Sequence, residues 1–352
     1  MKKNNIFKNI IIILLITAAI LYFVLRKDYH EIMILLTSVK VEYVLIAILV
    51  YLIYFMLDQL AFYKFIKNYN EKATYKFTLY VGIVTKFFNG ITPLATGGQP
   101  MQVYELHKSG MNAVNSTNAV VLNLMAFKCA YIFLTIVLFI IDRAFDIFNN
   151  IPVLRELTII GFVINTFLLI VMFIFSFSKD LNKKIIGFIV KLITKIFKKI
   201  DKAKVTKKIN DTCDEFYENA KSIAKNKILF VKCILIQLVS LLFYFSIPYV
   251  LCFAFNIHSL SIFNSIIAGM YVYIMGCSVP LPGSSGGMEY GFYGYYGKFI
   301  EGSSLGALML LWRTLTFYIP TILGAIILGI HKVKGDKKWY TSLKLKIWKK
   351  RR

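Results

Sequence analysis

Two stretches of the chain combine proline, paired glycines and polar side chains between apolar runs. The later one is Pro280-Leu-Pro-Gly-Ser-Ser-Gly-Gly-Met-Glu-Tyr-Gly291, and the earlier one, residues 89–102, reads Asn-Gly-Ile-Thr-Pro-Leu-Ala-Thr-Gly-Gly-Gln-Pro-Met-Gln. Proline lacks a backbone N–H and glycine adopts unusual backbone angles, so neither stretch is a plausible helix interior. At membrane depth an irregular backbone is tolerated only inside protein or beside a wet cavity. Two such stretches, one in each half, indicate a transporter-type binding site.

These residue types are suited to binding an anionic head group that carries hydroxyl groups. Backbone N–H groups freed in the glycine-rich turns can bind a phosphate, and Arg313 can pair with the same phosphate. Amide and hydroxyl side chains can hydrogen-bond the head-group hydroxyls. The glycine pairs have a second interpretation, which is close packing between helices. The candidate binding residues are Asn89, Thr92, Pro93, Thr96, Gly97, Gly98, Gln99, Gln102, Pro280, Pro282, Gly283, Gly286, Gly287, Glu289 and Arg313.

Several charged residues lie within or beside apolar runs, namely Asp58, Lys86, Lys128, Glu289 and Arg313. Each costs about 2.5–3.5 kcal/mol at the centre of a membrane-spanning helix unless it has a partner or a wet surrounding. One interpretation is structural pairing, for example of Asp58 with Lys86 or of Glu289 with Arg313. The other is a shared polar cavity. We favour the cavity, because the two irregular stretches supply further polar groups to it.

Composition places the chain among all-α polytopic membrane proteins. It has 352 residues, 58% of them hydrophobic, and a net charge of +24. The charge is clustered beside apolar runs, which is typical of cytoplasmic loops near anionic lipid, and no nucleic-acid-binding motif accompanies it. The chain has no P-loop motif, no HExxH motif and only scattered histidines. We therefore expect no cofactor, no metal site, no catalytic residue and no nucleic-acid partner.

The apolar runs give about eight hydrophobic segments. Six are long enough to cross a bilayer, and two shorter ones, 77–88 and 262–279, run into the irregular stretches. The six long runs are 10–25, 41–66, 117–141, 157–177, 228–255 and 305–330. The first follows Lys2, Lys3 and Lys8, and a signal peptide is its alternative interpretation. No small-residue cleavage site precedes Arg26, so we favour an uncleaved span.

The distribution of charge predicts the topology. Residues 179–228 hold 14 lysines against six acidic residues, and the tail from Lys332 holds ten Lys or Arg, so both are predicted to be cytoplasmic, as is the N-terminus. The N-terminus, residues 179–228 and the tail can all be cytoplasmic if the two short segments, 77–88 and 262–279, are re-entrant. The sequence thus predicts six full crossings and two re-entrant or broken segments that enter from opposite faces, an inverted arrangement. Crossing by two short half-helices per segment remains the alternative.

The basic insert 179–228 contains an amphipathic helix. Ile185, Ile189, Leu192, Ile196 and Ile200 recur at helical spacing, and lysines occupy the other faces. Residues 183–200 are therefore expected to lie on the inner leaflet and bind anionic lipids there. A solvated helix packed on the bundle is the other interpretation. The abundance of Lys, Ile and Asn with little Ala or Arg is typical of AT-rich bacterial genomes, so we expect a multi-pass protein of the bacterial cell membrane.

Two motifs in order resemble the signatures of a known family. Thr92-Pro-Leu-Ala-Thr-Gly-Gly-Gln-Pro-Met-Gln102 with the later Lys108-Ser-Gly, and Pro280-Leu-Pro-Gly-Ser-Ser-Gly-Gly-Met-Glu289, are similar to those of the lysylphosphatidylglycerol synthase transmembrane family. The resemblance implies a flippase-like membrane domain over residues 1–331, interrupted by the insert 179–228 and followed by a basic tail, 332–352. It also implies a phospholipid substrate, namely aminoacylated phosphatidylglycerol or a related anionic lipid, and a link to cationic peptide resistance.

Members with two domains carry a soluble C-terminal domain that transfers lysine from lysyl-tRNA. This chain ends at Arg352, about where such a domain would begin, so we expect a lipid translocase without that domain. The alternatives are a phosphatidylglycerol lysyltransferase that works through membrane residues and a non-transporting membrane scaffold. Whether the chain forms a homo-oligomer is left open.

Overall fold

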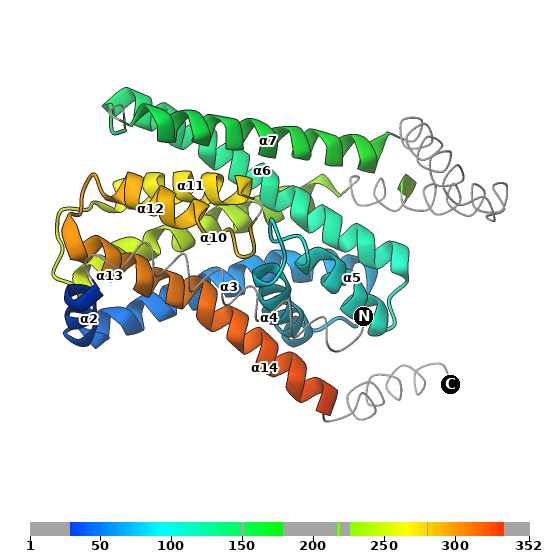
Figure 1. Ribbon diagram of the computed structural model, residues 1–352. Coiled ribbons are helices and arrows are strands. Elements are labelled where there is room, and N and C mark those ends of the chain that lie inside the picture. Colours follow the sequence, from blue (N-terminus) through cyan, green and yellow to red (C-terminus); the bar gives the residue numbers. More distant parts are fainter. Residues whose placement is uncertain (1–28, 149–150, 179–216, 219–225, 280, 334–352) are drawn as a thin grey trace, which may run out of the picture.

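The computed structural model describes residues 29–148, 151–178, 217–218, 226–279 and 281–333 (Figure 1). In these ranges the chain forms helices and no β-strand. The helices are α2 (Tyr29–Thr37), α3 (Val41–Tyr69), α4 (Tyr75–Gly90), α5 (Gly98–Lys108), α6 (Ala113–Phe145), α7 (Pro152–Phe177), α10 (Lys227–Ala254), α11 (Ile262–Ser278), α12 (Gly287–Tyr296), α13 (Gly302–Arg313), the π-helical turn η1 (Thr314–Tyr318) and α14 (Ile319–Val333). The predicted all-α class is confirmed.

Five long helical segments are apolar enough to cross a membrane. They are α3, α6, residues Pro152–Ile174 of α7, α10, and the continuous run Gly302–Ile330 formed by α13, η1 and most of α14. They match five of the six predicted spans. The predicted span 10–25, the lipid-binding stretch 183–200 and nearly all of the tail 332–352 lie outside the described residues.

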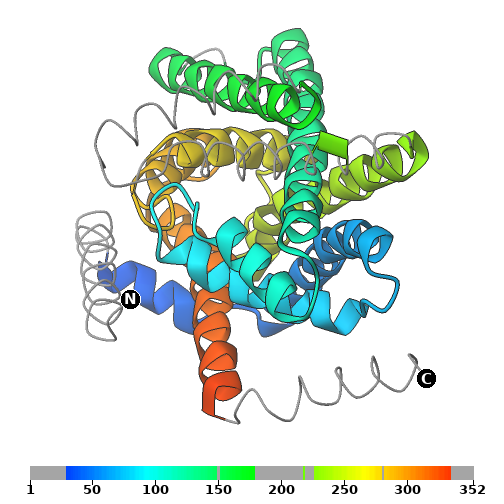
Figure 2. The same ribbon diagram turned by 90° about the vertical axis from the view of Figure 1, so that its right-hand side faces the viewer.

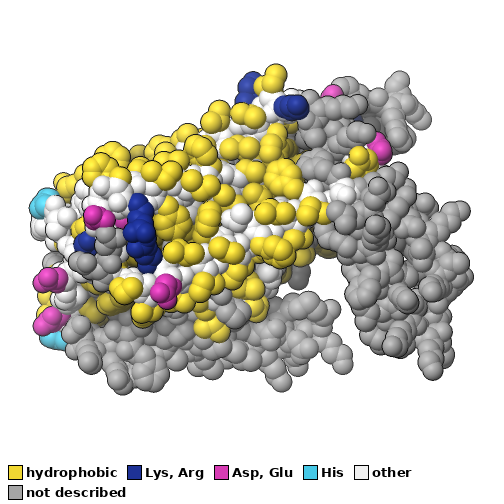
Figure 3. All heavy atoms as spheres, turned by 90° about the horizontal axis from the view of Figure 1, so that it is seen from above, with side chains coloured by type: hydrophobic (Ala, Val, Ile, Leu, Met, Phe, Trp, Pro, Cys, Tyr) yellow, Lys and Arg dark blue, Asp and Glu magenta, His cyan; other side chains and the backbone are white. Residues whose placement is uncertain are grey.

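The outer surface of the long helices suits a hydrocarbon solvent. On α3, Leu45, Leu49, Leu52 and Met56 recur at helical spacing and are all exposed. Hydrophobic side chains cover the middle of the face in Figure 3, and charged side chains gather toward its left-hand end. An apolar belt between charged ends is the surface expected of a membrane protein.

Local sequence signals explain where several helices begin. Side-chain oxygens of Thr74, Asn112, Asn226 and Ser261 accept hydrogen bonds from backbone N–H groups in the first turns of α4, α6, α10 and α11. These caps satisfy donors that have no partner within the helix. Pro152 lies in the first turn of α7, where its missing N–H costs nothing.

The two irregular stretches each connect a pair of short helices. α4 and α5 pack against each other, and so do α11 and α12. In Figure 1 the α11–α12 pair lies toward the left-hand end of the bundle, and the α4–α5 pair lies toward the right. Figure 2 looks at the right-hand end, where the α4–α5 pair (cyan) lies in the foreground among the long helices. This is the arrangement expected of two hairpins that enter from opposite sides.

The ends of the long helices agree with the charge-based topology. α7 ends, α10 begins and α14 ends toward the right-hand side of Figure 1, whereas the α6–α7 and α10–α11 connections lie at the left. The helix ends that flank the basic insert and the basic tail therefore lie at one end of the bundle. That this end faces the cytoplasm remains a prediction from the charge.

Candidate functional site

The two irregular stretches touch each other inside the bundle. Pro93 and Pro282 form an isolated antiparallel β-bridge, although 188 residues separate them in the sequence. The bridge joins the turn between α4 and α5 to the turn between α11 and α12. Each turn closes the tip of its own hairpin. The contact therefore brings together the two candidate binding segments that the sequence analysis identified separately.

The two turns have the same backbone design. In each, the proline precedes two successive residues with positive φ, and the next helix begins at the second glycine of the Gly-Gly pair. The residues with positive φ are Leu94 (54°), Ala95 (52°), Gly283 (62°) and Ser284 (54°). The backbone hydrogen bonds also correspond: Ala95 N to Thr92 O, Thr96 N to Pro93 O, Ser284 N to Leu281 O and Ser285 N to Pro282 O. Three of the four positive-φ residues are not glycine, and such strain is concentrated at functional sites.

Polar side chains of the first turn hold the turn itself. Asn89 Oδ1 accepts a hydrogen bond from the Gly98 N–H (2.9 Å), and Thr92 Oγ1 accepts one from the Gly97 N–H (2.8 Å). The Thr96 hydroxyl donates to the Pro93 carbonyl (3.0 Å). A Cβ on Gly98 would lie 2.2 Å from Asn89 Oδ1, so the bond requires glycine there. The sequence analysis proposed such N–H groups for anion binding. Those of Gly97 and Gly98 instead donate to side chains of the same stretch.

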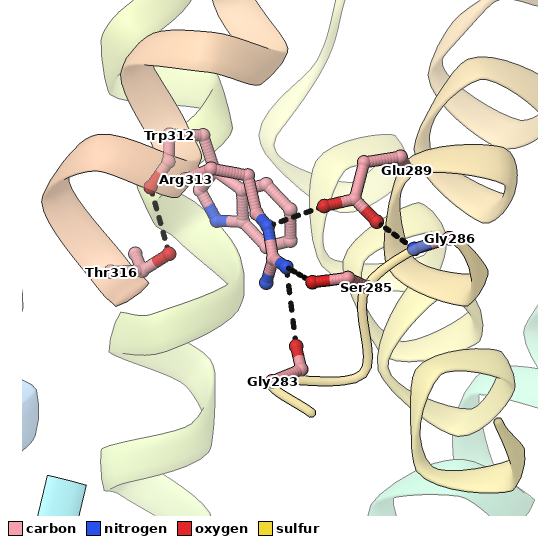
Figure 4. A network of polar contacts seen from close by, with 7 residues as sticks. All are labelled: Gly283, Ser285, Gly286, Glu289, Trp312, Arg313 and Thr316. Atoms are coloured by element: carbon pink, nitrogen blue, oxygen red, sulfur yellow. Dashed lines mark hydrogen bonds and ion pairs between the residues drawn. The ribbon is translucent and has the colours of Figure 1, made fainter. Parts of the chain in front are cut away.

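The second turn is held by a buried ion pair (Figure 4). Arg313 Nε lies 2.8 Å from Glu289 Oε1, and the two side chains are 3% and 2% exposed. Glu289 Oε2 also accepts a hydrogen bond of 2.6 Å from the N–H of Gly286, the residue that precedes α12. The carboxylate therefore binds both the helix start and the guanidinium.

Arg313, the last residue of α13, also binds the second turn. Its Nη2 donates to the Gly283 carbonyl (3.2 Å) and lies 3.5 Å from Ser285 Oγ. Its guanidinium carbon lies 4.4 Å from the centre of the Phe317 ring. Phe317 lies in η1, the π-helical turn that directly follows Arg313, and such turns occur often at functional sites. A Cβ on Gly283 would be 2.2 Å from Phe317 Cζ, so the turn fits against this ring only because Gly283 has no side chain.

The remaining predicted residues differ in their exposure. Pro93 and Thr96 are exposed, Gln99 is half-buried and Gln102 is buried. In the second turn Gly287 is buried, whereas Pro282 and Gly286 are half-buried. The first turn is thus the more open of the two. Pro280 lies outside the described residues.

The intramembrane charges do not form one cluster. Glu289 and Arg313 are paired, as one interpretation of the sequence anticipated. Asp58 instead accepts hydrogen bonds from Gln59 (2.7 Å) and Gln237 (3.1 Å). Lys86 donates to the Tyr54 hydroxyl (3.0 Å), and Lys128 donates to Asn165. In the described residues no ion pair joins Asp58 to Lys86.

Sequence reasoning missed two groups that hold Arg313, the Phe317 ring and the Ser285 hydroxyl. Phe317 stands one helical turn after Arg313, a spacing that could have indicated the contact. Within the described ranges no three His, Cys, Asp or Glu side chains lie together as a metal site would require. The arrangement can position side chains and bind a ligand. It lies where two broken helices meet inside the bundle.

Comparison with known proteins gives one family. The sequence pattern of the lysylphosphatidylglycerol synthase TM region matches residues 10–324 of the chain. The match includes both turns, the ion pair and all five long helical segments almost to the end of the last. No curated protein matches the chain significantly.

Proposed function

Because the chain belongs to the family of the lysylphosphatidylglycerol synthase TM region, we propose that it moves an anionic phospholipid between the leaflets of a membrane. The proposed substrate is phosphatidylglycerol, or its aminoacylated form. The proposed location is the bacterial cell membrane, with both termini cytoplasmic.

The observation that carries this proposal is the contact between the two broken segments. Irregular backbone is unfavourable in hydrocarbon, so two such turns that meet inside the bundle indicate a region shielded from lipid tails. In transporters, binding sites lie where broken helices of two repeats meet near the midplane. Hairpins that enter from opposite sides would place the Pro93–Pro282 contact between the two faces of the membrane.

A liposome assay tests the proposal. Purified protein is reconstituted with a trace of fluorescent phosphatidylglycerol, and dithionite, which does not cross the bilayer, bleaches the label in the outer leaflet. The bleached fraction should rise above the level in protein-free liposomes, and more for labelled phosphatidylglycerol than for labelled phosphatidylcholine. Equal bleaching with and without protein, for both lipids, would refute translocation and favour a scaffold.

A second assay addresses the lysyltransferase alternative. The same protein is supplied with lysyl-tRNA and phosphatidylglycerol, and the lipids are separated afterwards. We expect no lysylphosphatidylglycerol, because the family region that the chain matches is the TM region of these synthases. Product formed by pure protein would replace the translocase proposal with an enzymatic one.

A further inference from the structure

A run of buried tyrosines connects the two intramembrane lysines. Lys86 Nζ lies 5.0 Å from the centre of the Tyr54 ring, and Lys128 Nζ lies 5.4 Å from that of Tyr131. Between them the rings are in contact: Tyr54 with Tyr244 (4.8 Å between centres), Tyr244 with Tyr273 (6.2 Å) and Tyr273 with Tyr131 (5.6 Å). We call this set, from Lys86 to Lys128, the tyrosine seam.

The seam lies at the level of the two turns. Lys128 and Tyr244 stand near the middle of the long helices α6 and α10, whereas Lys86 and Tyr273 stand near the ends of α4 and α11, shortly before the turns begin. Tyr244 is also within electrostatic range of Arg313. The seam therefore runs through the centre of the bundle beside the Glu289–Arg313 pair.

The seam is not fully enclosed by protein. Lys86, Lys128, Tyr244 and Tyr273 are half-buried, and so is Cys277 of α11, which interacts electrostatically with Lys128. Each of these residues is therefore accessible to a group at least as large as a water molecule.

The polar groups of the seam and of Tyr51, whose ring packs against Tyr54, have unused capacity to donate hydrogen bonds. The hydroxyl groups of Tyr51 and Tyr131 are buried and have no hydrogen-bond partner among the described residues. Tyr51 is adjacent to the Tyr54 ring and within electrostatic range of Lys86. Each lysine uses one neutral acceptor although an ammonium group has three donors. Buried donors left unpaired are costly, so these groups indicate a missing acceptor.

The charge of the seam indicates that the missing acceptor is an anion. The seam carries one ammonium group at each end, and one carboxylate, that of Asp58, interacts with Lys86. Asp58 interacts electrostatically with Lys86, but both of its oxygens already accept hydrogen bonds from amide side chains. One positive charge remains without a counter-ion, and a phosphate would supply one together with acceptor oxygens.

We propose that the tyrosine seam, with the adjacent Tyr51, binds the phosphate group of an anionic phospholipid at its ends. Lys86 and Tyr51 supply charge and a neutral hydrogen bond at one end, and Lys128 and Tyr131 supply them at the other. This inference rests on the proposed function for the nature of the ligand. It assigns phosphate binding to the seam and leaves Glu289 and Arg313 to hold the second turn.

Binding is measured by native mass spectrometry of the full-length protein with added phosphatidylglycerol or with diacylglycerol of the same acyl chains, which lacks the phosphate. Wild-type protein should retain phosphatidylglycerol and release diacylglycerol. Lys86→Gln and Lys128→Gln should each weaken phosphatidylglycerol binding by about tenfold, since a charged hydrogen bond contributes on the order of 1.5–3 kcal/mol. Lys232→Gln, the same change at an exposed position of α10, should leave binding unchanged.

Two further variants exclude a loss of binding through misfolding. Tyr131→Phe and Tyr51→Phe remove only an unpartnered hydroxyl, so they should keep or raise the thermal stability of the lipid-free protein while weakening lipid binding several-fold. If the seam were merely structural, these variants would leave lipid binding unchanged. Inorganic phosphate at millimolar concentration should not displace the lipid, and displacement would overturn the assignment to a phospholipid.

The outcomes separate this inference from the proposed function. Suppose that the lysine variants bind phosphatidylglycerol as the wild-type protein does, and that liposomes containing the wild-type protein translocate this lipid. The seam is then not the phosphate site, and the translocase proposal stands. If wild type binds the lipid through the seam but moves none in the dithionite assay, the site stands and the translocase proposal fails. Loss of both binding and translocation in Lys86→Gln and Lys128→Gln supports both.

Discussion

The buried pair of Glu289 and Arg313 gives the sharpest prediction for stability. Arg313→Met keeps much of the side-chain volume but removes the counter-ion of the Glu289 carboxylate, which then keeps its hydrogen bond from the Gly286 N–H at 1% exposure. Removing one member of a buried pair costs about 3–5 kcal/mol, because the other charge remains buried without compensation. Arg313 also bonds the Gly283 carbonyl and covers Phe317, so we expect the upper part of this range.

Glu289→Gln should cost less, toward the lower end of that range. Glu289 uses one carboxylate oxygen for the Gly286 N–H and the other for the ion pair with Arg313. The glutamine keeps the shape but has only one acceptor oxygen, and the guanidinium loses its counter-charge. In the double variant, no unpaired ion remains. Its destabilisation should therefore fall short of the sum of the two single effects by about 1–3 kcal/mol.

The assay is a titration of the unfolding equilibrium with sodium dodecyl sulfate in mixed micelles, applied to wild type, both single variants and the double variant. The free energies of unfolding then form a double-mutant cycle. Glu301→Gln provides a control, because Glu301 is exposed and lies one residue before α13. Single effects that add to within about 0.5 kcal/mol would show that the two groups do not interact, and would refute the pairing.

Three further predictions follow from the turns and the topology. Gly283→Ala should destabilise the protein clearly more than Gly302→Ala in the same titration. Both glycines have a φ of 62°, but only at Gly283 would the added carbon meet a neighbour, Phe317 Cζ at 2.2 Å. Equal effects would contradict the close packing of Gly283 against Phe317. Cysteines at Pro93 and Pro282 should form a disulfide on mild oxidation, since bridged antiparallel residues have Cα separations of about 4.5–5.5 Å and disulfides accept about 4.4–6.8 Å. This cross-link should also slow lipid movement reversibly, and the absence of cross-linking in gels under oxidising conditions would argue against the contact between the turns. Single cysteines at positions 200 and 345, in a background without native cysteines, should resist an impermeant thiol reagent applied to whole cells while one at Ser259 reacts; labelling at 200 or 345 would reverse the topology.

Much of the fold could be predicted from the sequence, because its signals are local. Membrane-spanning helices need about 20 apolar residues, and hydrocarbon leaves the backbone little alternative to the helix, so apolar runs predicted the long helices directly. The prolines and glycines of 89–102 and 280–291 predicted where the helices break, since these residues constrain the backbone wherever they stand. Charge bias predicted which helix ends share a side, and the arrangement of α7, α10 and α14 agrees.

The site itself depended on contacts between residues distant in the sequence. The meeting of Pro93 with Pro282 requires both hairpins to enter the same bundle, and nothing local to either turn specifies it. Which charges pair was likewise decided by packing: Arg313 reaches Glu289 because α13 and η1 lie against the second turn, whereas Asp58 accepts hydrogen bonds from Gln59 and Gln237. An intramembrane charge must find a partner, and its sequence does not say which.

What the sequence alone determined, then, is where this chain is helical, where it breaks and which of its residues are costly in a membrane. These are properties of single residues and their immediate neighbours in a hydrocarbon solvent. The tertiary structure decided which of the costly groups satisfy one another and which, such as Tyr51 and Tyr131, are left with an unused donor. A hydrogen bond requires two groups within about 3 Å, and only the packing of α3, α4, α6, α10 and α11 brings such groups together or keeps them apart.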